Sequence, residues 1–277
     1  MRERIFVGEG RIDALPGDAR GLAYGDGLFE TMRVHHGAVR WWEAHMARLA
    51  NGARRLRIVL PDIAAIEREA RDLFADDGDG VLKLIVSRGG GGRGYAPTPD
   101  AAPLWRLSRH PLPPPARTGG LVLRWCDTPL ALQPALAGIK HCNRLEQVLA
   151  RAEWRDAGID EGLMRSTDGD VVCATAANLF LLRDGRWSTP RLDRCGVAGV
   201  CRAWVLSESA ATETRVAPAD VESADAVVLC NAVRGILPVA RLGARTWAPQ
   251  AAVADLRRRL AHAHPGFDAP RQDQENA

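Results

Sequence analysis

Lysine is almost absent from this chain. Of its 37 lysine and arginine residues, only Lys83 and Lys140 are lysines. An arginine guanidinium carries the same positive charge but cannot form an imine with a carbonyl compound, whereas a lysine amine can. A lysine retained in such a chain is therefore a candidate for covalent chemistry, with an incidental surface charge as the alternative for Lys140. Lys83 lies in a strand-like run with no polar neighbour typical of a site, so we expect no role for it.

Other absences narrow the class of protein. The N-terminus "MRERIFVGEG" lacks the apolar core of a signal peptide, and no apolar run has the length of a membrane span. The six cysteines show no CxxC spacing, which argues against a zinc site or a disulfide scaffold. The net charge of +3 is small and dispersed. We therefore expect a cytoplasmic protein with reduced thiols and neither nucleic acid nor membrane as a partner.

A proline cluster suggests that the chain has two parts. Four of the five positions from Pro111 to Pro115 are proline, which excludes a central strand or a helix interior. We expect an N-terminal α/β domain over 1–109, a linker over 110–119, a second domain over 120–267 and a disordered polar tail over 268–277. Strand and helix patterns alternate in both parts, so the fold class is α/β or α+β.

Several elements can be placed from their patterns. Apolar spacing predicts a helix over Arg40–Ile58, and a β-branched run predicts a strand over Gly80–Gly89. A second helix is expected over Asn143–Gly158, capped by Asn143 with Glu146 at capping-box spacing and ended by Gly158. Asp-Gly pairs beginning at Asp168 and Asp184 predict hairpins.

An anion site is predicted in the stretch "CGVAGVCRAWVL" (Cys195–Leu206), where a glycine-containing turn leads into an amphipathic helix. Backbone N–H groups at such a helix start can bind a phosphate, although a purely structural turn is the alternative. A lysine that forms an imine, together with a phosphate site, is what pyridoxal 5'-phosphate (PLP) requires.

At this point the residues resemble a known family. "LAYGDGLFETMRV", "EAHMARLANGARRLRI", "SRGGGGRGYAP", "AGIKHCNRLEQVLAR", "ATAANLFLLRDG", "TPRLDRCGVAGVCR" and "LCNAVRGILPV" follow one another in the order found in fold-type IV PLP enzymes, and among these they are similar to the aminodeoxychorismate lyases. Seven motifs in order are a specific signal, although each alone is weak. The resemblance implies two α/β domains with PLP in the cleft between them, and a homodimer.

The resemblance also implies roles for individual residues. Lys140 would be the imine-forming lysine and Arg48 would bind the PLP phosphate. Tyr24, Tyr95 and Arg93 are candidates for substrate binding, with packing aromatics and an exposed loop arginine as the alternatives. Thr31 matches a threonine of the lyases and is a candidate catalytic hydroxyl, with a solvent-facing strand threonine as the alternative. The backbone groups expected at the phosphate are those of Val200, Cys201, Asn231 and Ala232.

One position departs from the family pattern. In the family, a glutamate normally faces the pyridine nitrogen. When the motifs are aligned on Asn178, Cys173 occupies that position in this chain, and no acidic residue occurs from Val171 to Arg183. A carboxylate would keep that nitrogen protonated, whereas a thiol offers a weak hydrogen bond. We expect this replacement to suit a lyase, whose electrons leave with enolpyruvate, better than an aminotransferase.

The expected reaction is the conversion of 4-amino-4-deoxychorismate, a small-molecule substrate, to 4-aminobenzoate and pyruvate in folate biosynthesis. The alternatives are a D-amino-acid or branched-chain aminotransferase of the same fold, and a PLP-binding relative whose activity is reduced because Cys173 replaces the glutamate. No metal is expected.

Overall fold

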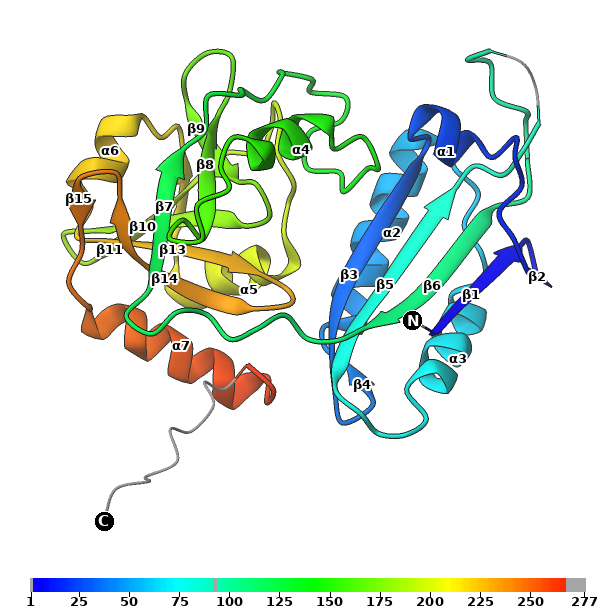
Figure 1. Ribbon diagram of the computed structural model, residues 1–277, viewed down its shortest axis with the longest axis horizontal. Coiled ribbons are helices and arrows are strands. Elements are labelled where there is room, and N and C mark those ends of the chain that lie inside the picture. Colours follow the sequence, from blue (N-terminus) through cyan, green and yellow to red (C-terminus); the bar gives the residue numbers. More distant parts are fainter. Residues whose placement is uncertain (1, 92–93, 268–277) are drawn as a thin grey trace. The chain divides into compact units, whose positions relative to one another are not determined.

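The computed structural model describes residues 2–91 and 94–267, which divide into two compact units (Figure 1). The first unit takes its described residues from Met1–Leu112, Ala131–Val148 and Leu192–Val200, and the second from Pro113–Leu130, Leu149–Arg191 and Cys201–Ala277. Each unit therefore contains separate stretches of chain. The sequential boundaries expected from the sequence stay a prediction, and the expected tail lies outside the described residues.

The first unit is built on a six-stranded antiparallel sheet in the order β2-β1-β6-β5-β3-β4. Its elements are β1 (Arg2–Val7), β2 (Gly10–Ile12), α1 (Arg20–Tyr24), β3 (Gly27–His35), β4 (Ala38–Val39), α2 (Trp42–Leu56), α3 (Ile63–Leu73), β5 (Gly80–Ser87) and β6 (Leu104–His110).

Strand β3 separates two faces of this sheet by strict alternation. Leu28, Met32 and Val34 point to the buried face, where they pack with apolar residues of α2 and α3. The buried charge Glu30 shares that face, whereas Phe29 and Thr31 lie on the opposite face and are half-buried. The core therefore lies between the sheet and its helices, and the other face of β3 carries Phe29 and the candidate site residue Thr31.

The second unit holds a nine-stranded mixed sheet in which β12-β11-β10-β13-β14-β7-β8-β9 follow one another and β15 pairs with β14. Its elements are β7 (Leu121–Trp125), β8 (Glu161–Arg165), β9 (Val171–Ala174), β10 (Asn178–Arg183), β11 (Arg186–Pro190), β12 (Thr212–Thr214), α6 (Pro218–Ser223), β13 (Ala226–Asn231), β14 (Gly235–Leu242), β15 (Arg245–Thr246) and α7 (Ala251–Ala263). Helices α4 (Leu145–Ala152) and α5 (Val200–Ser209) contain the points where the chain passes between units.

Most of the predicted elements are confirmed. Helix α2 and strand β5 lie within the ranges expected for them. The Asp168–Gly169 dipeptide lies in the turn between the antiparallel strands β8 and β9, and the Asp184–Gly185 dipeptide lies in the turn between β10 and β11. Asp184 and Gly185 have φ angles of 50° and 74°, as a tight hairpin turn requires. The glycine turn after Cys195 leads into α5, as predicted.

The capping predicted for the Asn143 helix is wrong. Helix α4 ends at Ala152, well before Gly158. The Asn143 side chain instead donates from Nδ2 to the Gly25 carbonyl at 3.1 Å, and Glu146 accepts a hydrogen bond from the Ala131 backbone N–H at 2.7 Å. Both side chains therefore form tertiary contacts, which a local capping pattern cannot distinguish from a cap.

In the part of the chain that the structure describes, no helix combines the length and the apolar composition needed to cross a membrane.

Candidate functional site

Lys140 lies in an extended segment that adds to the start of β3 in the first unit. The Phe29 N–H donates to the Lys140 carbonyl at 3.0 Å, and the Cys142 N–H donates to the Gly27 carbonyl at 2.9 Å. Residues opposite each other in such a pair point to the same side, and the Lys140 Nζ lies 4.2 Å from the centre of the Phe29 ring. The segment therefore places the Lys140 amine on the β3 face that does not carry the core.

The surroundings of Lys140 favour its neutral amine. Burial lowers its pKa most, the Arg48 charge lowers it further, and the Glu30 carboxylate only partly opposes them, so that the pKa falls to about 7. Among the residues that the structure describes, its Nζ has no hydrogen-bond or ion-pair partner. An amine with a pKa of about 7 is largely neutral just above pH 7, and in that form it is able to act as a nucleophile and as a base.

Arg48 is held in place by a fully buried carboxylate. Its Nε donates to Glu30 at 2.8 Å and its Nη2 forms an ion pair with the same carboxylate. Glu30 also accepts a hydrogen bond from the His45 Nδ1 at 2.6 Å. Burial raises the pKa of Glu30, but the Arg48 charge and the His45 hydrogen bond outweigh it and hold that pKa below its usual range. Burial lowers the pKa of His45, so the imidazole is neutral at pH 7.

Glu30 and His45 were not found by the sequence analysis. The available signal was weak: Glu30 occupies a buried position in the alternating pattern of β3, and His45 precedes Arg48 by one helical turn on α2.

Arg48 also contacts the predicted anion loop. Its Nη1 donates to the Ala198 carbonyl at 3.1 Å. The same loop pairs with the lysine segment, because the Gly138 N–H donates to Gly196 at 3.0 Å and the Ala198 N–H donates to Gly138 at 3.1 Å. Val200, at the end of this loop, is the first residue of α5. Within the first unit, Arg48, the lysine segment and the anion loop are therefore joined by direct hydrogen bonds.

Thr31 and Lys83 lie opposite each other on β3 and β5. Because residues two apart on a strand share a face, Thr31 lies on the same face as Phe29 and Lys140. The Lys83 Nζ lies 5.7 Å from the centre of the Phe29 ring, so both lysines of the chain approach one phenylalanine. The expectation that Lys83 has no site-like neighbour is wrong, because the strand register brings Phe29 and Thr31 beside it.

Four predicted site residues lie in the second unit. Cys173 is a buried residue of β9, and Cys201 is buried beside Cys230. Asn231 ends β13, and its Oδ1 accepts hydrogen bonds from the N–H groups of Val233 and Arg234 at 3.0 and 2.8 Å. The fourth residue, Ala232, lies in the turn between β13 and β14. Asn231 therefore shapes this turn through its own side chain.

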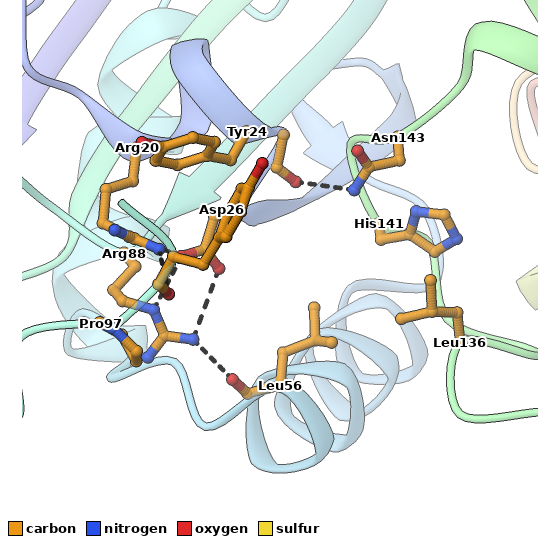
Figure 2. A pocket seen from close by; sticks show the side chains of 11 residues that line it. Arg20, Tyr24, Asp26, Leu56, Arg88, Pro97, Leu136, His141 and Asn143 are labelled. Atoms are coloured by element: carbon orange, nitrogen blue, oxygen red, sulfur yellow. Dashed lines mark hydrogen bonds and ion pairs between the residues drawn. The ribbon is translucent and has the colours of Figure 1, made fainter. Parts of the chain in front are cut away.

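Tyr24 and Tyr95 lie together at a pocket of about 340 Å³ in the first unit. Their ring centres are 5.5 Å apart, a proximity that the sequence did not predict. Figure 2 shows His141 and Asn143 on the side of the pocket away from Arg20 and Arg88. Burial, aided by the Arg144 charge, lowers the pKa of His141 to about 4. Arg93, the third predicted substrate ligand, lies outside the described residues.

Comparisons with known proteins agree with one another. A model of the family described as "Amino-transferase class IV" matches residues 27–242. An aminodeoxychorismate lyase of Vibrio harveyi is 36% identical over 81% of this chain and 86% of its own length. A solved structure of 4-amino-4-deoxychorismate lyase from Pseudomonas aeruginosa is 46% identical, with a TM-score of 0.87 over 93% of this chain and 98% of its own. A D-alanine aminotransferase of Bacillus licheniformis is 24% identical over 82% of each chain.

Proposed function

The chain belongs to the class IV amino-transferase family, whose members bind PLP, and within it we propose that this protein is an aminodeoxychorismate lyase. The reaction converts 4-amino-4-deoxychorismate to 4-aminobenzoate and pyruvate, which serves folate biosynthesis. The identity to two lyases, 36% and 46%, exceeds the 24% to the D-alanine aminotransferase. The two-sheet fold-type IV architecture is shared by lyases and aminotransferases, so the preference for the lyase rests on these identities.

The observation that carries the proposal of PLP chemistry is the amine of the half-buried Lys140, which lies 4.2 Å from the centre of the Phe29 ring and has a pKa of about 7. PLP, when bound, supplies an aldehyde that reacts with amines and a ring that accepts electron density. Lys140 would hold the cofactor in the resting enzyme. Once released by the incoming substrate amine, Lys140 would take the proton from the amine-bearing carbon of the substrate.

The residues around Arg48 fit a phosphate group. A guanidinium has five N–H groups. Three of those of Arg48 are used by Glu30 and Ala198, which leaves two for an anion. The backbone N–H groups of Val200 and Cys201 lie in the first turn of α5, where they have no partner within the helix. The turn after Asn231, including Ala232, would supply further contacts to the phosphate.

The face shared by Thr31 and Lys83 fits the substrate, which carries two carboxylates. The Lys83 ammonium is a point charge suited to one of them. The Thr31 hydroxyl would donate a proton to the leaving enolpyruvyl oxygen or hydrogen-bond to it. Tyr24, Tyr95 and Arg93 remain proposed substrate ligands, and Cys173 remains the proposed neighbour of the pyridine nitrogen.

We further propose a cytoplasmic homodimer. The described residues include all six cysteines, and none of the six forms a disulfide, in keeping with a reducing compartment. Helix α4 exposes Leu145, Val148 and Leu149, which are 76%, 59% and 60% exposed and share one helix face. An apolar face of this kind is suited to a second copy of the chain.

The test is 4-aminobenzoate formation by PLP-saturated protein from enzymatically generated aminodeoxychorismate, with Lys140→Ala as the blank. Borohydride reduction of the PLP-loaded protein should attach the cofactor to the Lys140 peptide. The mapping is unambiguous because Lys83 is the only other lysine, and Lys83→Ala should leave the attachment unchanged while raising KM.

Three outcomes separate the alternatives. Product that is lost in Lys140→Ala supports the lyase. PLP attachment with conversion of D-alanine or branched-chain amino acids, but no 4-aminobenzoate, would replace the lyase by an aminotransferase. Attachment without either reaction would identify a PLP-binding relative that has lost its chemistry.

A further inference from the structure

Arg20 is a buried arginine whose guanidinium contacts the backbone of the glycine-rich segment. Its residue is 5% exposed, although it lies in the short helix α1 near the surface residues Tyr24 and Tyr95. Nη1 donates to the Gly94 carbonyl at 3.1 Å, and Nη2 donates to the Tyr95 carbonyl at 3.1 Å. Nη1 also reaches the Ala96 carbonyl at 3.5 Å. One side chain therefore holds three consecutive carbonyl groups.

These contacts are the main attachment of a segment that is otherwise exposed. Tyr95 is 87% exposed, and its neighbours from Gly94 to Pro97 are exposed as well. Within residues 2–91 and 94–267, no hydrogen bond other than those of Arg20 reaches Gly94, Tyr95 or Ala96. Burying a charged side chain to bind three surface carbonyls costs desolvation energy, which indicates that the position of this segment matters.

Arg20 also orders the two tyrosines of the chain. Its guanidinium carbon lies 4.9 Å from the centre of the Tyr24 ring, and the Tyr24 and Tyr95 rings are 5.5 Å apart. Tyr24 is in the same short helix as Arg20, whereas Tyr95 is attached through its carbonyl. The Arg20 guanidinium therefore contacts both the Tyr24 ring and the backbone that carries the Tyr95 ring.

A second arginine, Arg88, provides a natural comparison. Arg20 Nε and Arg88 Nε both donate to the Asp26 carboxylate, at 3.0 and 2.9 Å (Figure 2). Burial raises the pKa of Asp26, but the hydrogen bonds from Arg88 and Arg20 outweigh it and keep the carboxyl ionised. The rest of the Arg88 guanidinium donates to the carbonyls of Leu56 and Arg57 at the end of α2, at 2.7 and 2.5 Å. The two arginines share a counter-ion but hold different parts of the chain.

We propose that Arg20 is a positioning residue for substrate binding: it fixes the Gly94–Ala96 backbone, and thereby Tyr95 against Tyr24, whereas Arg88, which shares Asp26 with it, holds the end of α2 and not this backbone. The substrate part of this inference rests on the proposed function. Arg20 touches no reacting atom, so it acts through the tyrosines that it orders.

The first experiment measures the segment without any assay of activity. Chymotrypsin cleavage after Tyr95 is followed by mass spectrometry for the wild-type protein, Arg20→Gln, Arg20→Lys and Arg88→Gln, each below its melting temperature. Loss of charged hydrogen bonds should raise the cleavage rate at Tyr95 about tenfold in Arg20→Gln. Arg20→Lys keeps the charge beside Asp26 but cannot span three carbonyls, so this variant should also be cleaved faster at Tyr95. It replaces Arg20→Gln in the experiment if Arg20→Gln fails to fold. Arg88→Gln should lower the melting temperature and leave this cleavage rate unchanged.

The second experiment measures 4-aminobenzoate formation in the PLP-loaded proteins. Arg20→Lys should raise KM by about tenfold, with kcat within about twofold and the cofactor absorbance unchanged. Combined with Tyr95→Ala, it should add little further to KM, because both changes remove the same ordered ring. Additive increases in KM would show that Arg20 does not act through Tyr95.

Two results would overturn the proposal as a whole. One is equal cleavage at Tyr95 in the wild-type protein and the Arg20 variants. The other is that Arg20→Lys and Arg88→Gln change KM and melting temperature alike, which would reduce Arg20 to a general stabilising residue. If the wild-type protein forms no 4-aminobenzoate but Arg20 still protects Tyr95, the proposed function and the substrate part fail together, while the role in holding the segment stands.

Discussion

At the scale of single residues, Lys140 should be a liability to the stability of the folded protein. Its pKa is about 7 when folded and near 10.5 when exposed, so the unfolded state binds more protons between these values and wild-type stability rises with pH there. Without cofactor, Lys140→Met should therefore raise the melting temperature most at pH 7 and below. The gain corresponds to a few kcal/mol, at about 1.4 kcal/mol per pKa unit, and should disappear near pH 10. Thermal melts at pH 7, 8.5 and 10 measure this gain; a gain that does not change with pH would contradict the lowered pKa of the Lys140 amine.

Cys173 is the residue whose replacement should change the reaction. In Cys173→Glu, a carboxylate at the proposed position beside the pyridine nitrogen should stabilise negative charge at the amine-bearing carbon. We expect transamination of D-alanine to increase relative to 4-aminobenzoate formation, measured as the ratio of the two rates in one preparation. Cys173→Gln is the control, because glutamine has nearly the size of glutamate but carries no charge. An unchanged ratio in Cys173→Glu would show that the thiol is not what favours elimination.

From the sequence, the chemistry of a single residue could be predicted more readily than the identity of its neighbours in space. Lys140 could be singled out by its scarcity, because only an amine forms an imine. Lys83 was misjudged because its neighbour Thr31 lies across a strand pair, and the register of β3 and β5 is not visible in either strand alone. Glu30 was missed for a related reason: its partners Arg48 and His45 belong to α2.

At the scale of elements, the position of Lys140 depends on how its segment adds to β3. Gly25 ends α1 with a φ of 62°, and a Cβ there would lie 2.6 Å from the Asn143 Oδ1. Gly25→Ala therefore combines a left-handed backbone with a collision beside the Asn143 hydrogen bond. We expect a loss of about 2 kcal/mol or more in unfolding free energy, together with weaker PLP attachment at Lys140.

Gly8→Ala is the matched control for this change. Gly8 has a φ of 57°, but a Cβ there would make only an ordinary contact at 3.7 Å with Ala102. It should cost about 1 kcal/mol and leave PLP attachment intact. Chemical denaturation and borohydride trapping measure the two effects. Equal PLP attachment in both variants would show that the Gly25–Asn143 contact does not position Lys140.

The same contact explains why the end of the lysine segment was predicted incorrectly. Asparagine before an apolar periodic run is typical of a helix cap, and the run itself did become α4. The side chain of Asn143 instead binds Gly25, which is 118 residues away in sequence. Local rules locate helices and hairpins reliably here, since α2 and both Asp-Gly hairpins formed as predicted, but they carry no information on such distant partners.

At the scale of the whole molecule, the exposed face of α4 is the feature that an isolated chain does not explain. Leu145, Val148 and Leu149 lie within one helical turn, and apolar side chains gathered in this way usually mark an interface.

If a second copy covers this face of α4, glutamates there would be buried without partners, at a cost of several kcal/mol. The double variant Leu145→Glu, Leu149→Glu should therefore be monomeric where the wild-type protein is dimeric, as measured by sedimentation at equal concentration. Val59→Glu, which changes a single exposed residue between α2 and α3, should remain dimeric. A wild-type monomer would contradict the dimer itself, and a double variant that stays dimeric would move the interface away from α4.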